Sequence, residues 1–338
     1  MKQAAIFGER QAMLVEKEIP ALQEGWALVK IMAAPMCAEY KDFVQGRQVD
    51  ALGHEAAGIV VEAAPGSVVA VGDRVVAMPL TSCGKCELCR AGDYIHCESS
   101  QHVSLPTMAQ YVAKPSWLLA KIPDGISYER ASLACCGLGP SFGALEKMGV
   151  DAFTTVLITG LGPVGLGAVI NARFRGARVI AVEMNEYRQK LALELGAEQI
   201  IDPRDEQAVQ KIKALTDGKG PDCGVDCSGV VAAHRLQIDA VRRLGKVAFV
   251  GESYNDTPIR ISPDLIRKGI SLIGVWHYNL NSIPKVMQVI TESPILDKLI
   301  THRFPLDQIG EALEVSAGQN CAKIILHPWE EGADALEY

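Results

Sequence analysis

Short apolar runs separated by turn residues fill the first part of the chain, up to about residue 145. Three of these runs, at residues 27–31, 58–62 and 73–79, are rich in Val and Ile and are bounded by Gly, Pro or charged residues. Runs of this kind predict strands, because β-branched side chains fit a pleated, half-buried surface. Long stretches with a helical period are absent from this part of the sequence, so we expect it to be β-rich.

From residue 155 the pattern changes to apolar strands that alternate with helical stretches. This alternation is typical of βαβ units and predicts a parallel sheet. Strands are expected at residues 156–159, 178–182, 199–201, 224–227, 245–251 and 271–275, with helices up to Arg175 and over residues 188–195. Two further helices, over residues 282–291 and 308–317, and a terminal strand at residues 323–326 complete the prediction.

One uncharged stretch, from Ala152 to Ala172, has the length of a membrane-spanning helix. It contains several glycines and Pro163 and begins with β-branched residues, which favours a strand, a turn and a helix instead. The N-terminal apolar patch is too short for a signal peptide. We therefore expect a cytoplasmic protein that does not insert into a membrane.

The composition narrows the range of partners. The 338 residues are enough for two domains, at about 150 residues each. Acidic residues outnumber basic ones, 40 to 33, which gives a net charge of −7. Proteins that bind nucleic acids or anionic membranes usually present a basic face, so we expect neither kind of partner.

Ten cysteines are the unusual feature of the composition. In a reducing compartment, closely spaced cysteines bind metals or carry out redox chemistry more often than they form disulfides. Four of them have the spacing C-x2-C-x2-C-x7-C: Cys83, Cys86, Cys89 and Cys97. Four thiolates in one short loop can close a tetrahedron around a structural Zn²⁺ and leave no open position. An iron–sulfur cluster is the alternative use of such spacing.

A G-x-G-x-x-G pattern follows the first strand of the second region and opens the next helix. It contains Gly160, Gly162, Pro163, Val164 and Gly165. Such glycines allow a tight turn in which backbone N–H groups and the helix N-terminus bind a pyrophosphate. Glu183 ends the next strand, where its carboxylate can accept from a ribose hydroxyl and would repel a 2′-phosphate, so NAD is favoured over NADP. Arg188 could instead accommodate the 2′-phosphate of NADP. For the glycine-rich pattern as a whole, the alternative is a plain βα turn that binds no ligand.

A second group of metal-ligand residues lies outside the four-cysteine lobe. It comprises Cys37, His54 with the adjacent Glu55, and the Cys135–Cys136 pair. Two thiolates and one imidazole leave a fourth position on Zn²⁺ for water or a substrate oxygen, which is the arrangement of a catalytic site. Taken singly, each cysteine could instead pack as a small apolar residue. His54 could instead form a simple hydrogen bond and bind no metal.

In these motifs and in their order, the chain resembles the zinc-dependent medium-chain alcohol and polyol dehydrogenases over nearly its whole length. The motifs are the string Gly53-His54-Glu55-Ala56-Ala57-Gly58, the four-cysteine lobe and the glycine-rich turn. The resemblance implies an α/β protein with a chaperonin-10-like, β-rich catalytic domain and a doubly wound, Rossmann-type NAD-binding domain. It implies limits of 1–148 for the first and 149–277 for the second, with residues 278–338 returning to complete the catalytic domain.

The same resemblance implies roles for single residues. Cys37 and His54 become ligands of a catalytic zinc and Glu55 an acid beside the metal, while the four-cysteine lobe holds a second, structural zinc. The onward spacing matches the frame of the animal alcohol dehydrogenases, which selects Cys136 as the third catalytic ligand. The yeast-type frame selects Cys135 and stays open as the alternative.

The chain departs from the family pattern directly after Cys37. Family members commonly carry Cys-x-Ser/Thr-Asp, in which the hydroxyl passes on the substrate proton, whereas this chain has Cys37-Ala38-Glu39-Tyr40. We expect Glu39 or Tyr40 to take that proton, since both are acid–base groups. The alternative is that Glu39 only supports the metal site or faces solvent.

Strand ends in the second region complete the expected cofactor site, because ligands collect at strand ends in open parallel sheets. By resemblance, Val250 with Gly251 and Val275 with Trp276 line the nicotinamide, and Cys227 ends a neighbouring strand. Trp276 and His277 could instead pack where the two domains join and make no contact with the cofactor.

Together these features predict a zinc-dependent oxidoreductase that transfers a hydride between an alcohol and NAD. The resemblance favours a polyol, sugar or sugar-like secondary alcohol as substrate and implies a homodimer or homotetramer. One alternative is a reductase that acts mainly on carbonyls. Another is a non-catalytic NAD- or zinc-binding sensor, which the missing hydroxyl relay suggests. A zinc-independent reductase is disfavoured, because such proteins lack the Gly-His-Glu string and the four-cysteine lobe.

Overall fold

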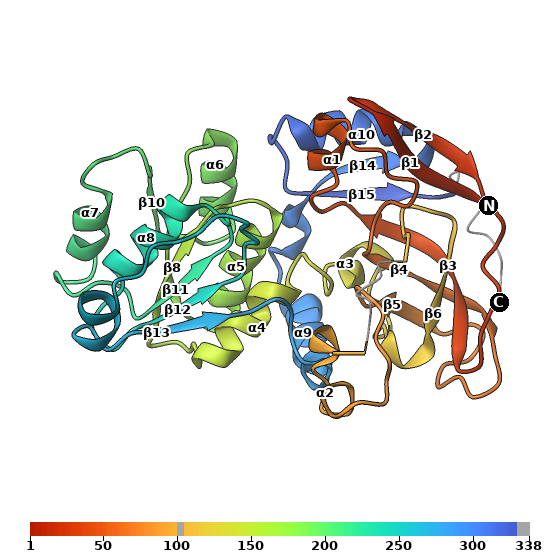
Figure 1. Cartoon of the computed structure of the whole chain (residues 1–338), viewed down its shortest axis with the longest axis horizontal. Helices are drawn as coiled ribbons and strands as arrows, with labels where there is room; N and C mark the ends of the chain where they lie inside the picture. Colours follow the sequence, from red (N-terminus) through yellow and green to blue (C-terminus); the bar gives the residue numbers. More distant parts are fainter. Residues whose placement is uncertain (100–104, 330–338) are drawn as a thin grey trace. The chain divides into compact units, whose positions relative to one another are not determined.

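The computed structural model describes residues 1–99 and 105–329. The chain folds into two compact units (Figure 1). Unit 1 comprises Met1–Cys136, Asn279–Thr291 and the chain from Ile300 onward, and unit 2 comprises Gly137–Tyr278 and Glu292–Leu299. The domain limits expected from the sequence stay a prediction, and residues 330–338 of the third expected segment lie outside the described residues.

Unit 1 is built around a seven-stranded sheet in which β14 and β15 pair in parallel and the other pairs are antiparallel. In spatial order its strands are β14 (Ile300–Pro305), β15 (Lys323–His327), β3 (Trp26–Pro35), β4 (Ala56–Ala63), β5 (Arg74–Ala77) and β7 (Leu119–Lys121), with β6 (Tyr111–Pro115) paired to β3. A separate hairpin joins β1 (Lys2–Gly8) and β2 (Gln11–Glu16). The helices that accompany this sheet are α1 (Tyr40–Gln45), α2 (Glu87–Arg90), α3 (Tyr128–Ser132), α9 (Ile283–Glu292) and α10 (Ile309–Ala317).

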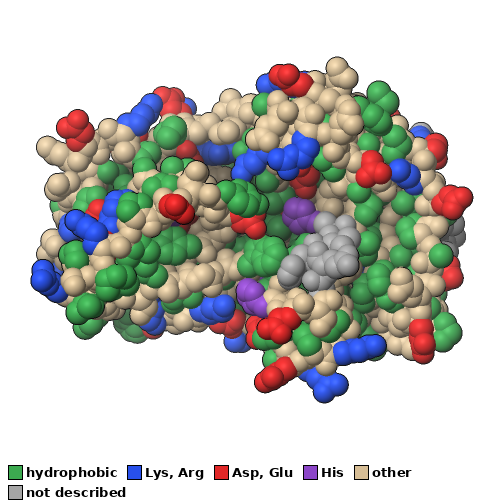
Figure 2. Space-filling model, in the orientation of Figure 1, with side chains coloured by type: hydrophobic (Ala, Val, Ile, Leu, Met, Phe, Trp, Pro, Cys, Tyr) green, Lys and Arg blue, Asp and Glu red, His purple; other side chains and the backbone are tan. Residues whose placement is uncertain are grey.

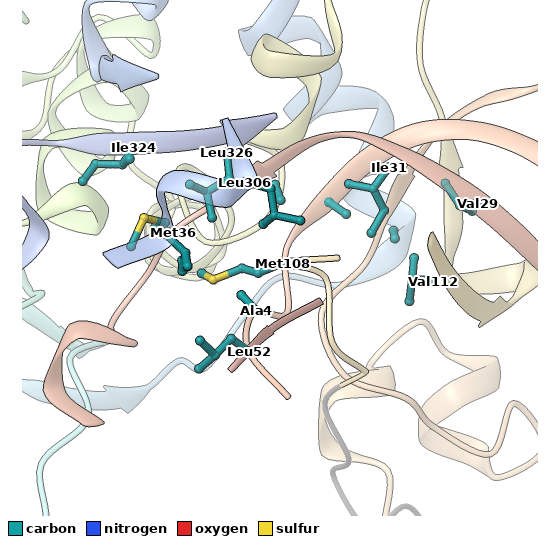
Figure 3. Packing of buried hydrophobic residues seen from close by; sticks show 14 of the residues in the cluster. Ala4, Val29, Ile31, Met36, Leu52, Met108, Val112, Leu306, Ile324 and Leu326 are labelled. Carbon is teal, nitrogen blue, oxygen red and sulfur yellow. The ribbon is translucent and has the colours of Figure 1, made fainter. Parts of the chain in front are cut away.

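The core of unit 1 contains side chains from both ends of the chain (Figure 3). Val29 and Ile31 point into it from alternate positions of β3, and Ile324 and Leu326 reach it from β15. Each of these side chains is at most 1% exposed. Burying one such side chain contributes on the order of 1.5–3 kcal/mol. The C-terminal strand therefore belongs to the same core as the first strands.

Unit 2 holds a six-stranded parallel sheet. In spatial order its strands are β10 (Gln199–Ile201), β9 (Arg178–Val182), β8 (Thr155–Thr159), β11 (Cys223–Asp226), β12 (Lys246–Phe249) and β13 (Ser271–Gly274). Its main helices are α4 (Gly139–Met148), α5 (Pro163–Phe174), α6 (Glu186–Glu194), α7 (Ala208–Ala214) and α8 (Val231–Ala240). The chain order reverses between β8 and β11, which makes the carboxyl ends of these strands the expected ligand-binding edge. This doubly wound sheet confirms the predicted α/β class.

The uncharged stretch is divided between a strand and a helix, as its glycines predicted. Residues 155–159 form β8 and residues 163–174 form α5. Within the described part of the chain, no helix is long and apolar enough to cross a membrane.

The region up to residue 145 is β-rich as expected, but it also contains the helices α1, α2, α3 and α4, which the sequence did not predict. All residues of α4 from Gly139 to Leu145 are buried. A helix that is covered on most sides carries no polar stripe, so it shows no amphipathic period in the sequence. The other three helices have only four to six residues each and are too short to establish a period.

Glu129 of α3 connects this helix to the two C-terminal strands. Its carboxylate accepts a hydrogen bond from Arg303 Nε at 2.8 Å and lies 2.9 Å from His327 Nε2. The bond to His327 is the main cause that lowers the pKa of Glu129 from 4.5 to about 2, and Glu129 in turn raises the pKa of His327. A carboxylate whose pKa falls on folding stabilises the protein above its unfolded pKa and loses that contribution as the pH falls toward the folded value.

We expect Glu129→Gln to lower the free energy of unfolding by about 1–2 kcal/mol near neutral pH. This value is smaller than the full pKa shift would give, because the half-exposed Arg303 interacts through solvent, which screens its charge. The difference from the unmodified chain should narrow below pH 4.5, where the unfolded Glu129 is protonated. It should also narrow as the pH rises through the elevated pKa of His327, because the imidazole then loses its charge. Urea unfolding at several pH values measures this difference. The exposed Glu206→Gln is the control, and an equal loss in both variants would contradict the assignment.

Candidate active site and cofactor site

The four cysteines of the lobe converge on one point. Their sulfurs all lie within 4.8 Å of one another. The sulfurs of Cys83 and Cys89 are 3.9 Å apart, as are those of Cys86 and Cys97. Four thiolates at about 2.3 Å from a central zinc would be separated by about 3.8 Å in a tetrahedron. The donor set and its geometry therefore fit one zinc ion held by four sulfurs.

Backbone N–H groups support negative charge in this lobe. Those of Lys85 and Cys86 each lie 3.4 Å from Cys83 Sγ and lower the pKa of that thiol to about 6. Burial instead raises the pKa of Cys89 to about 12. A metal must displace the proton of such a thiol, so metal binding at the lobe is coupled to proton release.

A second cluster gathers residues from three distant segments of unit 1. The ligand atoms of Cys37, His54, Glu55 and Cys136 all lie within 4.8 Å of one another. His54 Nε2 is 3.3 Å from Cys136 Sγ, close to the separation of about 3.6 Å expected for a nitrogen and a sulfur on one tetrahedral zinc. The His54 side chain is 27% exposed. Two thiols and an accessible imidazole form a donor set that fits zinc.

Glu55 is fully buried and both of its oxygens are engaged. Oε1 accepts a hydrogen bond from Lys323 Nζ at 2.6 Å, and Oε2 accepts one from the backbone N–H of Cys136 at 3.0 Å. Burial raises the pKa of Glu55 to about 7 even though the Lys323 ammonium opposes the shift. Lys323 also donates to the carbonyl of Met36 at 2.9 Å. With Glu55 occupied in this way, the cluster offers three free donor atoms.

The two adjacent cysteines point in different directions. Cys135 is fully buried, its Sγ lies 3.5 Å from the carbonyl of Ala77, and burial raises the pKa of its thiol. Cys136 places its sulfur in the cluster. Of the two alternatives left open by the sequence, the geometry favours Cys136.

Glu39 lies against two residues of the cluster. Glu39 Oε2 accepts a hydrogen bond from the N–H of Cys37 at 2.7 Å, and Oε1 lies 3.5 Å from His54 Nδ1. Burial raises the pKa of Glu39. Tyr40 begins α1 and packs against the hydrophobic core of unit 1. A carboxylate beside the free ring nitrogen of a metal-binding histidine fixes the orientation of the ring.

The glycine-rich turn at the carboxyl end of β8 forms a cradle in unit 2. A Cβ at Gly165 would lie 1.8 Å from the carbonyl oxygen of Gly160, so only glycine allows α5 to pack against the turn. A Cβ at Gly162 would meet no atom within 4 Å. Pro163 and Val164 form the first turn of α5. The open space at Gly162 and the N–H groups of the helix N-terminus fit a pyrophosphate.

Glu183 follows β9 and is bound to the same turn. Its Oε2 accepts a hydrogen bond from the N–H of Leu161 at 2.8 Å, and its Oε1 accepts bonds from Met184 and Asn185 at 2.8 and 3.0 Å. A carboxylate has about four acceptor positions, so one remains for a ribose hydroxyl. Arg188, in the first half of α6, has a buried Nε without a hydrogen-bond partner among the described residues.

The remaining expected cofactor residues lie at the carboxyl edge of the same sheet. The parallel pairing of β11, β12 and β13 aligns the ends of these strands. The residues that follow these strands are Cys227, Val250, Gly251, Val275 and Trp276. Trp276 is 38% exposed, whereas His277 is buried and stacks on Tyr278.

Asp226 organises this edge and was not predicted from the sequence. Asp226 is fully buried. Its carboxylate accepts hydrogen bonds from the hydroxyls of Thr159 and Ser228, each at 2.7 Å. Its carbonyl accepts the N–H groups of Val250 and Gly251, each at 2.9 Å. An acid that ends an otherwise uncharged strand is the signal that could have identified it. Lys323 was missed in the same way, since it lies in the apolar terminal strand.

Comparisons with known proteins cover both units. Residues 23–124 match the family model of the alcohol dehydrogenase GroES-like domain, and residues 163–292 match that of the zinc-binding dehydrogenases. The sorbitol dehydrogenase of Bacillus subtilis is 32% identical, with 97% of each chain covered. The L-threonine 3-dehydrogenase of Pyrococcus horikoshii is 31% identical, with 93% of this chain and 94% of that protein covered.

A solved structure agrees with these matches. The alcohol dehydrogenase TADH from Thermus sp. ATN1 has a TM-score of 0.90 at 25% identity, with 97% of this chain and 100% of that chain covered. The matched regions contain the four-cysteine lobe, His54 and the last three residues of the glycine-rich turn, and they confirm the resemblance drawn from the sequence. The chain therefore belongs to the zinc-dependent medium-chain alcohol and polyol dehydrogenases, NAD-dependent oxidoreductases that act on alcohols.

Proposed function

We propose that this protein oxidises a secondary hydroxyl of a polyol or sugar-like alcohol with NAD, and reduces the corresponding carbonyl in reverse. The cluster of Cys37, His54 and Cys136 carries the proposal. Three donor atoms lie together, and the adjacent Glu55 is bound by other groups. This leaves a fourth position for a substrate oxygen, which is the mark of a catalytic rather than a structural zinc site.

We assign two zinc ions to each chain. Cys37, His54 and Cys136 would hold the catalytic ion, and Cys83, Cys86, Cys89 and Cys97 the structural one. When bound, the catalytic ion supplies a positive charge that stabilises the substrate oxygen after it loses its proton. The chain itself positions the ligands, since Glu55 holds the N–H of Cys136 and Glu39 lies beside Cys37 and His54.

The nucleotide half of the reaction belongs to unit 2. The turn at Gly160–Gly165 would bind the pyrophosphate and Glu183 the ribose, while Cys227, Val250, Gly251, Val275 and Trp276 would line the nicotinamide side. The carboxylate of Glu183 would repel a 2′-phosphate, which supports NAD as the cofactor. Arg188 would lie near the same ribose.

The proposal also covers the cellular location and the oligomeric state of the protein. All ten cysteines are free of disulfides, as expected for a reducing compartment, and we propose a cytoplasmic location. We also propose a homodimer or homotetramer, which rests on family membership alone.

An alcohol panel with matched cysteine variants tests the function. We expect NAD-dependent oxidation of sorbitol to exceed that of L-threonine and ethanol, with NADP a poor substitute.

Cys136→Ala should abolish turnover and lower the zinc content by about one ion per chain. Cys135→Ala should keep both zinc ions and most of the activity, because its thiol faces Ala77. Absence of turnover with every alcohol and carbonyl would favour the sensor alternative, and loss of zinc in Cys135→Ala would reverse the ligand assignment.

Glu183→Ala should weaken NAD binding at least ~10-fold, because it removes the ribose acceptor and leaves the buried N–H of Leu161 unpaired. NADP should be affected less, since the repulsion of its 2′-phosphate is also removed. Steady-state KM values for both cofactors measure this change in preference. Glu186→Ala, an exposed acid in the first turn of α6, is the control. An equal loss for NAD and NADP would argue against a ribose contact.

Glu39→Gln should lower zinc retention at the second cluster by about 10–100-fold, because the amide holds the His54 ring less strongly than the carboxylate does. Competition with a chelator, followed by metal analysis, measures this retention, with the exposed Glu62→Gln of β4 as the control. The pH profile of kcat separates the two roles predicted for Glu39. A changed profile with full zinc retention would assign proton transfer to Glu39 in place of this positioning role.

A further inference from the structure

A cationic pocket lies in unit 2 at the opposite end of the sheet from the glycine-rich turn. Its volume is about 310 Å³, and its lining includes Lys213, Lys219, Arg243, Arg267 and Lys268. These residues come from the end of α7 and from the segments that precede β11, β12 and β13. Because the strands are parallel, their amino ends share one edge. Figure 1 shows α7 at this edge, where the strands begin.

The charges of the pocket are not balanced by its own lining. None of the residues that line it is acidic. Within residues 1–99 and 105–329, no hydrogen bond or ion pair holds the side-chain nitrogens of Lys213, Lys219 or Arg267. This end of the unit carries blue Lys and Arg side chains on the face drawn in Figure 2. The pocket is therefore a concentration of free positive charge on a chain whose net charge is −7.

Two of the five cations have structural tasks. Lys268 Nζ donates to the carbonyls of Ile238 and Asp239 at the end of α8, and Arg243 donates to the carbonyl of Arg267. Such bonds explain one cation at a helix C-terminus. They do not explain Lys213, Lys219 and Arg267. The positive charges of these three side chains repel one another and that of Lys268 unless an anion lies between them.

The two carboxylates whose charges act on Lys268 are held by arginines. Asp239 accepts two hydrogen bonds from Arg235, and Asp264 accepts bonds from Arg235 and Arg260. Burial, followed by the charge of Lys213, lowers the pKa of Lys268 to about 8. Neither of these two acids belongs to the lining, in which every charged residue is a lysine or an arginine.

We propose that this pocket binds a small polyphosphate anion at a site separate from the NAD site. A pocket of this volume lies at the lower end of the range for small-molecule sites. Several cations around one cavity match an anion with several charges, and arginine with lysine is the usual donor set for phosphate oxygens. Inorganic triphosphate and a nucleoside triphosphate share this chemistry.

Calorimetric titration of the NAD-saturated protein with inorganic triphosphate and, separately, with ATP tests the proposal, because NAD then fills the glycine-rich turn. We expect saturable binding that weakens as the salt concentration rises. The triple variant Lys213→Gln/Lys219→Gln/Arg267→Gln should bind at least ~10-fold more weakly. It should retain NAD-dependent turnover, since none of these residues lies at the carboxyl edge of the sheet. Tighter binding of ATP than of triphosphate would assign a nucleotide, and equal binding would assign the phosphates alone.

The matched control removes the same number of charges from the same unit. Lys147→Gln/Lys190→Gln/Lys298→Gln replaces three lysines outside the pocket and should bind like the unmodified protein. An equal loss in both triple variants would overturn the proposal, because binding would then follow net charge rather than the pocket. Absence of binding to the NAD-saturated, unmodified protein would overturn it as well.

Discussion

The buried ion pair between Lys323 and Glu55 is the constraint on which the second metal cluster depends. Both side chains are inaccessible to solvent and their charged atoms are 2.6 Å apart. Removing one partner from such a pair leaves an unpaired charge in the interior, at a cost of about 3–5 kcal/mol. The pair therefore fixes β15 against the segment that carries His54.

The remaining hydrogen bonds of the pair reach the other two ligand segments. Lys323 donates to the carbonyl of Met36, directly before Cys37, and Glu55 accepts from the N–H of Cys136. Three ligand-bearing segments that are distant in sequence are thus joined through two side chains. The four-cysteine lobe needs no such device, because its ligands lie within residues 83–97 and local N–H groups orient the sulfurs.

This difference between local and distant contacts explains what the sequence could predict. The lobe, the glycine-rich turn and the alternation of strands and helices are local patterns, and each was predicted at its observed position. The partner of Glu55 lies 268 residues away along the chain, so no spacing rule could reveal it. The choice between Cys135 and Cys136 depended on which thiol turns toward His54, and that direction follows from the packing of Cys135 beneath Ala77. The buried helix α4 was missed because complete burial removes the polar stripe that marks a helix.

The charge balance of the second cluster explains why it favours a divalent cation. Cys37, Cys136, Glu39 and Glu55 can each carry a negative charge, whereas Lys323 and His54, whose pKa is raised to about 9, can each carry a positive charge. A fully ionised set would still hold about two uncompensated negative charges in a mostly buried space, which is costly. The pKa values respond accordingly: those of Cys136, Glu39 and Glu55 are raised, and only that of Cys37 is well below its usual value. A divalent ion would neutralise the negative charge of the thiolates, and the carboxylate of Glu39 beside them adds a further negative charge that such an ion would offset.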